Sequence, residues 1–183
     1  MLKQLEQKLA KPMGKVAVEE LARNLGSADE AVLFLIAQST HDNDAIAFRA
    51  SWVLERVLLF YPEVFKDWIG EFLTTYPIVK GFSAQRHYSK MLLMLYKEKL
   101  INQSKFSEPQ FELCLEVSFD RLLNPKTPVA VQCNIMDAIA LLAKHYLWAY
   151  DELQHILQQK LVSNSPALAV RAKRLLAQKD LKK

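Results

Sequence analysis

The chain has 183 residues, of which 51% are hydrophobic and 24% charged, with a net charge of +4, four glycines and two cysteines. This apolar content is enough for a sizeable core, and four glycines exclude a glycine-rich phosphate-binding loop. Leucine, alanine, lysine, glutamate and glutamine dominate, and all of them favour helices. The composition therefore predicts an all-α fold in one domain, residues 1–183.

Helices are predicted wherever apolar residues recur with helical spacing between breakers such as Pro62, Gly26 and Pro125. The first predicted helix carries Leu2, Leu5 and Leu9 and ends near Pro12; the others are 16–25, 31–38, 42–60, 63–73, 83–100, 111–123, 129–144, 151–161 and 166–176. Ser27 or Asp29 is expected to cap the third helix. Asp42, Asn43 or Asp44 is expected to cap the fourth, because the oxygen of a short side chain accepts a hydrogen bond from an unpaired backbone N–H.

The stretch 42–60 carries apolar residues on two sides. One stripe has i, i+4, i+7, i+11 spacing and consists of Ile46, Ala50, Val53 and Val57. A second side carries Phe48, Trp52 and Leu59. A helix at the surface of a simple globule needs one apolar face, whereas a helix inside a stack of pairs needs two. Truncation of Trp52 to alanine is expected to cost about 3–5 kcal/mol.

Four predicted helices repeat one local pattern. A small residue precedes an arginine or glutamine by two positions, which aligns Arg49, Arg86, Gln132 and Arg171. Their separations of 37, 46 and 39 residues fall in the range of HEAT and armadillo units. Within 42–60, the pattern DxxxxRAxxxL resembles the second helix of a HEAT repeat, which implies a bond between Asp44 or its equivalent and Arg49 across neighbouring repeats. The resemblance implies a right-handed α-α superhelix of four to five HEAT-like pairs; an irregular helical bundle is the alternative.

The two cysteines and the lengths of the apolar runs lead to expectations about the compartment and about membrane contact. Cys114 and Cys133 lie in apolar helical patterns, so we expect reduced core thiols and a cytoplasmic protein. The N-terminal stretch 1–13 lacks the uninterrupted apolar run of a signal peptide. The longest apolar runs, 31–37 and 91–96, are far shorter than the ~20 residues that span a bilayer. No membrane partner is expected.

Catalytic signatures are absent from the sequence. It has no GxSxG, no GxxxxGK[ST], no CxxC, no HExxH and no EF-hand spacing, so no catalytic residue, metal or cofactor is nominated. His41 with Asp42 and Asp44 could bind a divalent cation, but helix capping explains the same carboxylates. An enzyme acting through His41, His87 or His145 would need a pocket in which that histidine meets a carboxylate or tyrosine.

An interaction surface is the remaining hypothesis. If the second helices line one face, their cations and aromatic rings can meet a partner there, together with an aromatic anchor from the group 145–150. The candidate residues are Arg49, Trp52, Arg56, Arg86, Lys90, Trp148, Arg171 and Arg174. Ordinary repeat stacking is the alternative, in which each arginine bonds an aspartate or a helix C-terminal carbonyl of the next repeat, and the aromatic group packs as core.

Two binding functions are consistent with such a surface. Extended helical-repeat surfaces commonly bind a protein or peptide, and this is the primary expectation. A basic concave face that binds nucleic acid is the alternative, since seven cations against one carboxylate give the chain +6 from Lys160 onward and leave −2 for the rest. The basic C-terminal end also complements the dipole of a last helix. A HEAT-like family, the alkylpurine DNA glycosylases, uses such a groove on duplex DNA, but its catalytic arrangement is not matched in this sequence.

Overall fold

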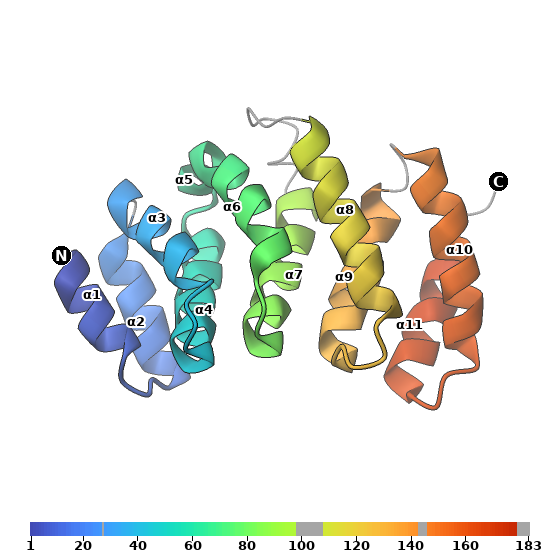
Figure 1. Cartoon of the computed structure of the whole chain (residues 1–183), viewed down its shortest axis with the longest axis horizontal. Helices are drawn as coiled ribbons and strands as arrows, with labels where there is room; N and C mark the ends of the chain where they lie inside the picture. Colours follow the sequence, from blue (N-terminus) through green and yellow to red (C-terminus); the bar gives the residue numbers. More distant parts are fainter. Residues whose placement is uncertain (27, 98–107, 143–145, 179–183) are drawn as a thin grey trace.

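In the computed structural model the chain forms a curved row of helical pairs, and the structure describes residues 1–26, 28–97, 108–142 and 146–178 (Figure 1). The helices are α1 (Leu2–Leu9), α2 (Lys15–Leu25), α3 (Asp29–Gln38), α4 (Asp44–Phe60), α5 (Pro62–Phe65), the 3₁₀ turn η1 (Lys66–Trp68), α6 (Ile69–Thr75), the 3₁₀ turn η2 (Tyr76–Ile78), α7 (Phe82–Lys97), α8 (Glu108–Leu123), α9 (Val129–Leu142), α10 (Leu147–Leu161) and α11 (Pro166–Leu176). Every regular element in these ranges is helical, which confirms the predicted all-α fold.

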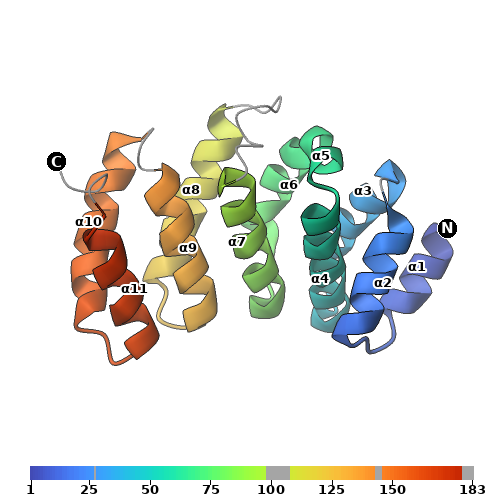
Figure 2. The same ribbon diagram turned by 180° about the vertical axis from the view of Figure 1, so that it is seen from behind.

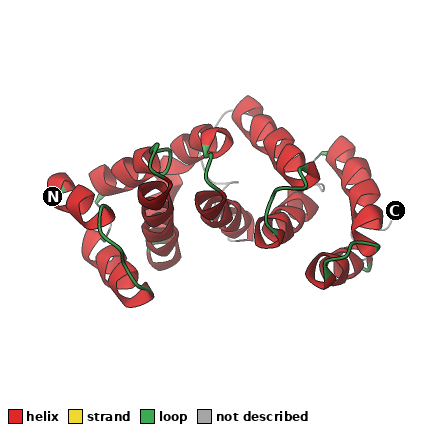
Figure 3. Cartoon of the chain, turned by 60° about the horizontal axis from the view of Figure 1, so that its bottom comes forward, coloured by secondary structure: helices red, strands yellow, loops and turns green. Residues whose placement is uncertain are grey.

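The pairs stack into two layers. The inner layer consists of α2, α4, α7, α9 and α11, and each of these helices packs against the next one in that order. The outer layer consists of α1, α3, the segment from α5 to α6, α8 and α10. Figure 2 shows the inner layer from the front, and Figure 3 shows that the row bends so that this layer lines the concave side. The superhelix of pairs predicted from the repeats is therefore confirmed.

Helix α4 has neighbours on two sides, as the sequence predicted, but the second predicted apolar side, Phe48, Trp52 and Leu59, is not fully buried. It packs against its own partner α3 and against the inner helices α2 and α7. Its buried residues are Ala47, Ala50, Ser51, Val53, Leu54, Glu55, Val57 and Leu58. Four assignments differ from the prediction: Leu59 is 48% exposed, and Ile46, Phe48 and Trp52 are half-buried. The exposed Leu59 therefore lies between Leu58, which is buried, and Phe60, which packs against the core.

Helix caps follow the prediction at α4 but not at α3. The Asn43 side chain accepts a hydrogen bond from the backbone N–H of Ala45 at 2.9 Å, and this satisfies one of the unpaired donors of the first turn. Asp29 does not cap α3. It is the first residue of that helix, and its carboxylate accepts from the indole N–H of Trp68 at 3.1 Å. Ser27 lies outside the described residues.

The predicted helix 63–73 is divided in the structure. The turn η1 separates α5 from α6, and it places Trp68 beside α3, where the bond to Asp29 forms. The residues predicted to point inward are nevertheless fully buried, namely Phe65, Ile69, Phe72 and Leu73. Hydrophobic spacing predicted the buried face correctly, but a spacing pattern does not register a change from α-helical to 3₁₀ winding.

The predicted helix 151–161 begins earlier than expected. Helix α10 starts at Leu147, so Trp148 and Tyr150 lie within the helix and not in a turn between helices. His145 lies outside the described residues, as do the ends of the predicted helices at 98–100 and 143–144.

The core lies between the two layers. The ring of Phe72 on α6 stacks on that of Tyr88 on α7, with centroids 4.9 Å apart and planes 13° apart. Both cysteines are free and buried, which confirms that they are core residues. Burial raises the pKa of the Cys114 thiol to about 12, so the thiol stays protonated and unreactive at neutral pH.

Candidate interaction surface

A buried carboxylate organises the inner layer between α4 and α7. Glu55 is 2% exposed. Its two oxygens accept hydrogen bonds from His87 Nδ1 and from Lys90 Nζ, each at 2.6 Å. Burial by itself would raise the pKa of Glu55, but the hydrogen bonds and charges of His87 and Lys90 outweigh it, so the net pKa is lowered. Glu55 is therefore ionised at neutral pH, and His87 donates to it from Nδ1.

Three rings form a stacked group beside this carboxylate, which we call the aromatic platform: Phe48, Trp52 and His87. Phe48 and Trp52 share one face of α4 with Glu55, because the three positions are spaced i, i+4, i+7. The ring centroids of Phe48 and Trp52 lie 5.5 Å apart. Those of Trp52 and His87 lie 6.1 Å apart, with planes only 18° from parallel. All three residues are partly exposed to solvent.

Arg49 and Arg56 join neighbouring pairs of the stack. The Arg49 guanidinium donates to the backbone carbonyls of Leu9 at 2.5 Å and Ala10 at 3.4 Å, at the end of α1. Arg56 pairs with Glu55 at 3.5 Å and with Glu19 of α2 at 3.8 Å. Both cations thus have partners inside the protein, as ordinary repeat stacking requires. The bond implied between Asp44 and Arg49 is replaced by the bond from Arg49 to the end of α1.

A second carboxylate ties the last two inner helices together. Asp137 on α9 is 8% exposed, and it accepts hydrogen bonds from both Arg171 and Arg174 on α11. The Arg174 bond is 2.8 Å long. Two cations on one carboxylate leave a positive charge at this end of the inner layer.

The remaining candidates separate into the two layers. Arg86 on α7 is exposed, and within the described ranges no ion pair involves its guanidinium. Trp148 lies on α10 in the outer layer, where its ring packs near that of Phe119 with centroids 5.6 Å apart. The structure therefore brings Trp52, Arg56 and Lys90 together around Glu55, and it places Trp148 on the opposite layer.

The predicted alignment of the second helices needs correction at α7. Gln85 donates to the carbonyls of Val79 and Lys80 at 3.0 and 3.2 Å, and Gln132 donates to the carbonyl of Thr127 at 2.7 Å. Each glutamine is the fourth residue of its helix, and its side chain donates to backbone carbonyls of the loop that precedes the helix. Gln132 is thus equivalent to Gln85 and not to Arg86.

Sequence reasoning missed His87 of the platform and Glu55, the carboxylate that binds it. Neither residue is among the candidate surface residues that the sequence predicts. The available signal was the i, i+4, i+7 spacing of Phe48, Trp52 and Glu55. The enzyme hypothesis requires a pocket in which a histidine meets a carboxylate or tyrosine, and the bond between His87 and Glu55 meets only the second part of that requirement. Since Glu55 also binds Lys90 and Arg56, its contacts are those of a structural ion-pair network.

Stacked helical pairs with a continuous concave layer define an α-helical repeat protein. A family model described as a HEAT repeat domain matches residues 5–179. Because this match spans nearly the whole chain, the chain belongs to the HEAT repeat domain family, and the resemblance inferred from its repeats is confirmed. Comparison with curated proteins and with solved structures found no match. Within the described ranges, no helix has the length and apolar character needed to cross a membrane.

Proposed function

We propose that this chain is a non-enzymatic interaction module that binds a protein or peptide through its inner layer. The observation that carries the proposal is the aromatic platform held in place by Glu55. Rigid aromatic surface is the usual anchor of protein interfaces, and a side chain already fixed by stacking loses little entropy on binding. Trp52 would be the anchor, with the exposed Arg86 and Lys90 beside it.

The bonding of the cations supports a protein partner over a nucleic acid. Arg49 donates to backbone carbonyls, Arg56 pairs with two glutamates, and Arg171 and Arg174 share Asp137. A cation that already has a carboxylate partner releases fewer counterions on meeting a phosphate backbone, and it contributes less to nucleic-acid affinity.

Nucleic-acid binding is the alternative, and the charge of the inner layer favours it. The five inner helices contain ten lysines and arginines against five aspartates and glutamates. A positive concave face attracts polyanions over a long range. Binding of labelled duplex DNA that falls steeply between ~50 and ~200 mM salt would support this alternative.

We also propose that the five pairs act as one domain in a reducing compartment such as the cytoplasm. Contacts between successive inner helices and the bond from Arg49 to α1 support the single domain. The two free, buried thiols support the compartment.

Selection from a displayed library of random peptides against the immobilised chain tests the protein-binding proposal. We expect enriched peptides that bind wild type and bind Trp52→Ala at least about tenfold more weakly. Trp148→Ala is the matched control, because it removes an exposed tryptophan from the outer layer. Trp52→Leu retains apolar volume while removing the stacking face, which guards against a folding defect. Absence of enriched peptides, or equal sensitivity to both tryptophans, would contradict the proposal.

A further inference from the structure

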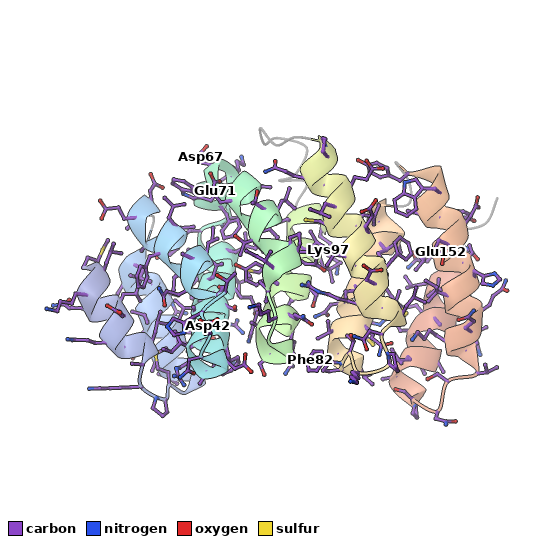
Figure 4. All side chains as sticks on the ribbon, viewed as in Figure 1. Asp42, Asp67, Glu71, Phe82, Lys97 and Glu152 are labelled. Carbon is purple, nitrogen blue, oxygen red and sulfur yellow. The ribbon has the colours of Figure 1, made fainter. Side chains whose placement is uncertain are left out.

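One face of α7 combines three cations with a leucine. Arg86, Lys90, Leu93 and Lys97 are spaced i, i+4, i+7, i+11, so they form a single stripe along the helix. Eleven residues of α-helix extend about 16 Å. The stripe begins beside the aromatic platform, since Lys90 binds Glu55, and it ends at Lys97, the last residue of α7 (Figure 4).

The far end of the stripe borders a cleft between three inner helices. The cleft has a volume of about 240 Å³ and is lined by α7, α9 and α11. Its apolar lining includes Leu93, Leu141 and Leu175, of which Leu93 and Leu175 are 8% and 2% exposed. Lys97 and Arg174 also line it. The cleft therefore combines apolar side chains with two cations.

The charge around this cleft is unbalanced. Asp137 also lines it, but this carboxylate is already shared by Arg171 and Arg174. Lys97 is exposed, and no ion pair among the described residues involves it. All of the net positive charge of the inner layer comes from α7 and α11, since the charges of α2 and of α4 each cancel and α9 carries one aspartate.

We infer that the stripe and the cleft bind an acidic segment of a partner protein, with one apolar side chain in the cleft and carboxylates on Arg86 and Lys97. The inference rests on the proposed function and names the chemistry of the partner. The charges of the segment are complementary to the unpaired cations, and its apolar side chain is complementary to Leu93, Leu141 and Leu175. The segment would extend from the cleft along α7 to the aromatic platform.

Two other ligands fit this surface less well. A phosphate backbone has no apolar group for the leucine lining, and its spacing calls for several unpaired cations, whereas Lys90 and Arg174 already bind carboxylates. A small molecule usually occupies a pocket of roughly 300–1,000 Å³ that encloses most of its surface, and this cleft is smaller and open.

Fluorescence anisotropy with three labelled probes tests the inference on the full chain. The probes are a glutamate-rich peptide with two spaced leucines, the same peptide with lysine in place of every glutamate, and a single-stranded oligodeoxythymidylate. We expect the glutamate peptide to bind and the lysine peptide not to bind. Omission of the leucines is expected to weaken binding, because the cleft is then left unfilled.

Charge reversal locates the binding surface. Arg86→Glu with Lys97→Glu is expected to weaken binding of the glutamate peptide by about tenfold or more. The control is Lys3→Glu with Lys126→Glu, which changes the net charge equally at exposed positions away from the stripe. Thermal unfolding of each variant verifies that it is folded.

Each outcome decides the inference separately from the proposed function. Tighter binding of the oligonucleotide than of the glutamate peptide, with the same sensitivity to Arg86 and Lys97, would overturn the inference in favour of nucleic acid. If both double variants lost the same amount of affinity for the glutamate peptide, the attraction would be non-specific, and this would also overturn the inference. If library peptides bind through Trp52 while the glutamate peptide does not bind, the inference fails and the protein-binding function stands.

Discussion

The two layers of the stack use charge in opposite ways. The helices of the outer layer contain twelve aspartates and glutamates against five lysines and arginines, and those of the inner layer contain five against ten. Inner carboxylates such as Glu55 and Asp137 are buried and bind cations of the neighbouring pair. Outer carboxylates such as Asp67, Glu71 and Glu152 extend from the opposite layer (Figure 4), and no ion pair in the described part of the chain involves them.

The difference shows how a repeat protein can hold its pairs together and still leave cations at the surface of one layer. In the outer layer, a side chain donates hydrogen bonds to backbone carbonyls of the neighbouring pair. Arg121 donates to the carbonyls of Tyr76 and Val79 at 2.8 and 3.0 Å. In the inner layer, buried carboxylates bind cations that are partly exposed, such as Lys90 and Arg174, so groups that stabilise this layer also shape the surface that a partner would meet.

The largest effect is expected in the core between the layers. Phe72→Ala should reduce the free energy of unfolding by about 3–5 kcal/mol, because its ring is fully buried against Tyr88. Trp52→Ala should cost only about 2 kcal/mol, less than the sequence predicted, because Trp52 is half-buried. Urea unfolding measures both. Equal losses would mean that Trp52 is core and not an accessible platform.

The next effect concerns the inner carboxylate. Glu55→Gln should cost about 2 kcal/mol at neutral pH, because Lys90 and His87 lose a buried anionic partner. The lowered pKa of Glu55 means that its ionised form stabilises the fold above the ordinary carboxyl pKa. This contribution is lost as pH falls through the folded-state pKa. The gap between wild type and Glu55→Gln should therefore shrink below about pH 4.5.

Glu112→Gln is the control for Glu55, because Glu112 is exposed on the outer helix α8. It should change the free energy of unfolding by less than about 0.5 kcal/mol. A loss at Glu112 as large as that at Glu55 would remove the distinction between the layers.

A smaller effect is expected where Arg49 connects the layers. Arg49→Ala should cost about 1–2 kcal/mol, since the carbonyls of Leu9 and Ala10 lose their donor. Hydrogen exchange should show the loss as faster exchange in α1. Arg86→Ala is the matched control, because Arg86 is exposed and should change stability by less than about 0.5 kcal/mol. Unchanged exchange in α1 would show that the Arg49 bonds do not hold it.

The smallest effect is expected on the outer layer. Glu112, Glu116 and Asp120 are exposed at four-residue spacing on α8, and like charges at i, i+4 repel. Glu116→Lys should replace two repulsions by two attractions and stabilise the chain by about 0.5–1 kcal/mol at low salt. The gain should diminish at high salt. A loss of stability would show that Glu116 has a structural role.

The sequence predicted the layers better than it predicted the site. Spacing alone identified α4 as a helix with neighbours on two sides. It also identified Phe65, Ile69, Phe72 and Leu73 as buried. Those features depend on periodicity within one helix. The arginine alignment was wrong at α7 because local pattern does not fix which position of a helix meets its neighbour.

The platform could not be predicted for a related reason. The contacts of Glu55 with His87 and Lys90 join residues more than 30 positions apart, and they depend on how α4 and α7 pack. The sequence places Trp148 with the inner arginines only because a tryptophan is a common anchor of protein interfaces. Trp148 lies in the outer layer because α10 packs there, and the sequence pattern does not show which layer α10 joins.

The most direct test of the inner layer as the binding face uses the three tryptophans of the chain. Trp52 lies on the inner layer, whereas Trp68 and Trp148 lie on the outer layer, where Trp68 binds Asp29. Their indole N–H signals in a ¹H–¹⁵N spectrum can be assigned with single Trp→Phe variants and followed as a selected peptide is added. We predict that the Trp52 signal shifts while the other two stay in place. A shift confined to Trp68 or Trp148 would place the partner on the outer layer and contradict the proposal.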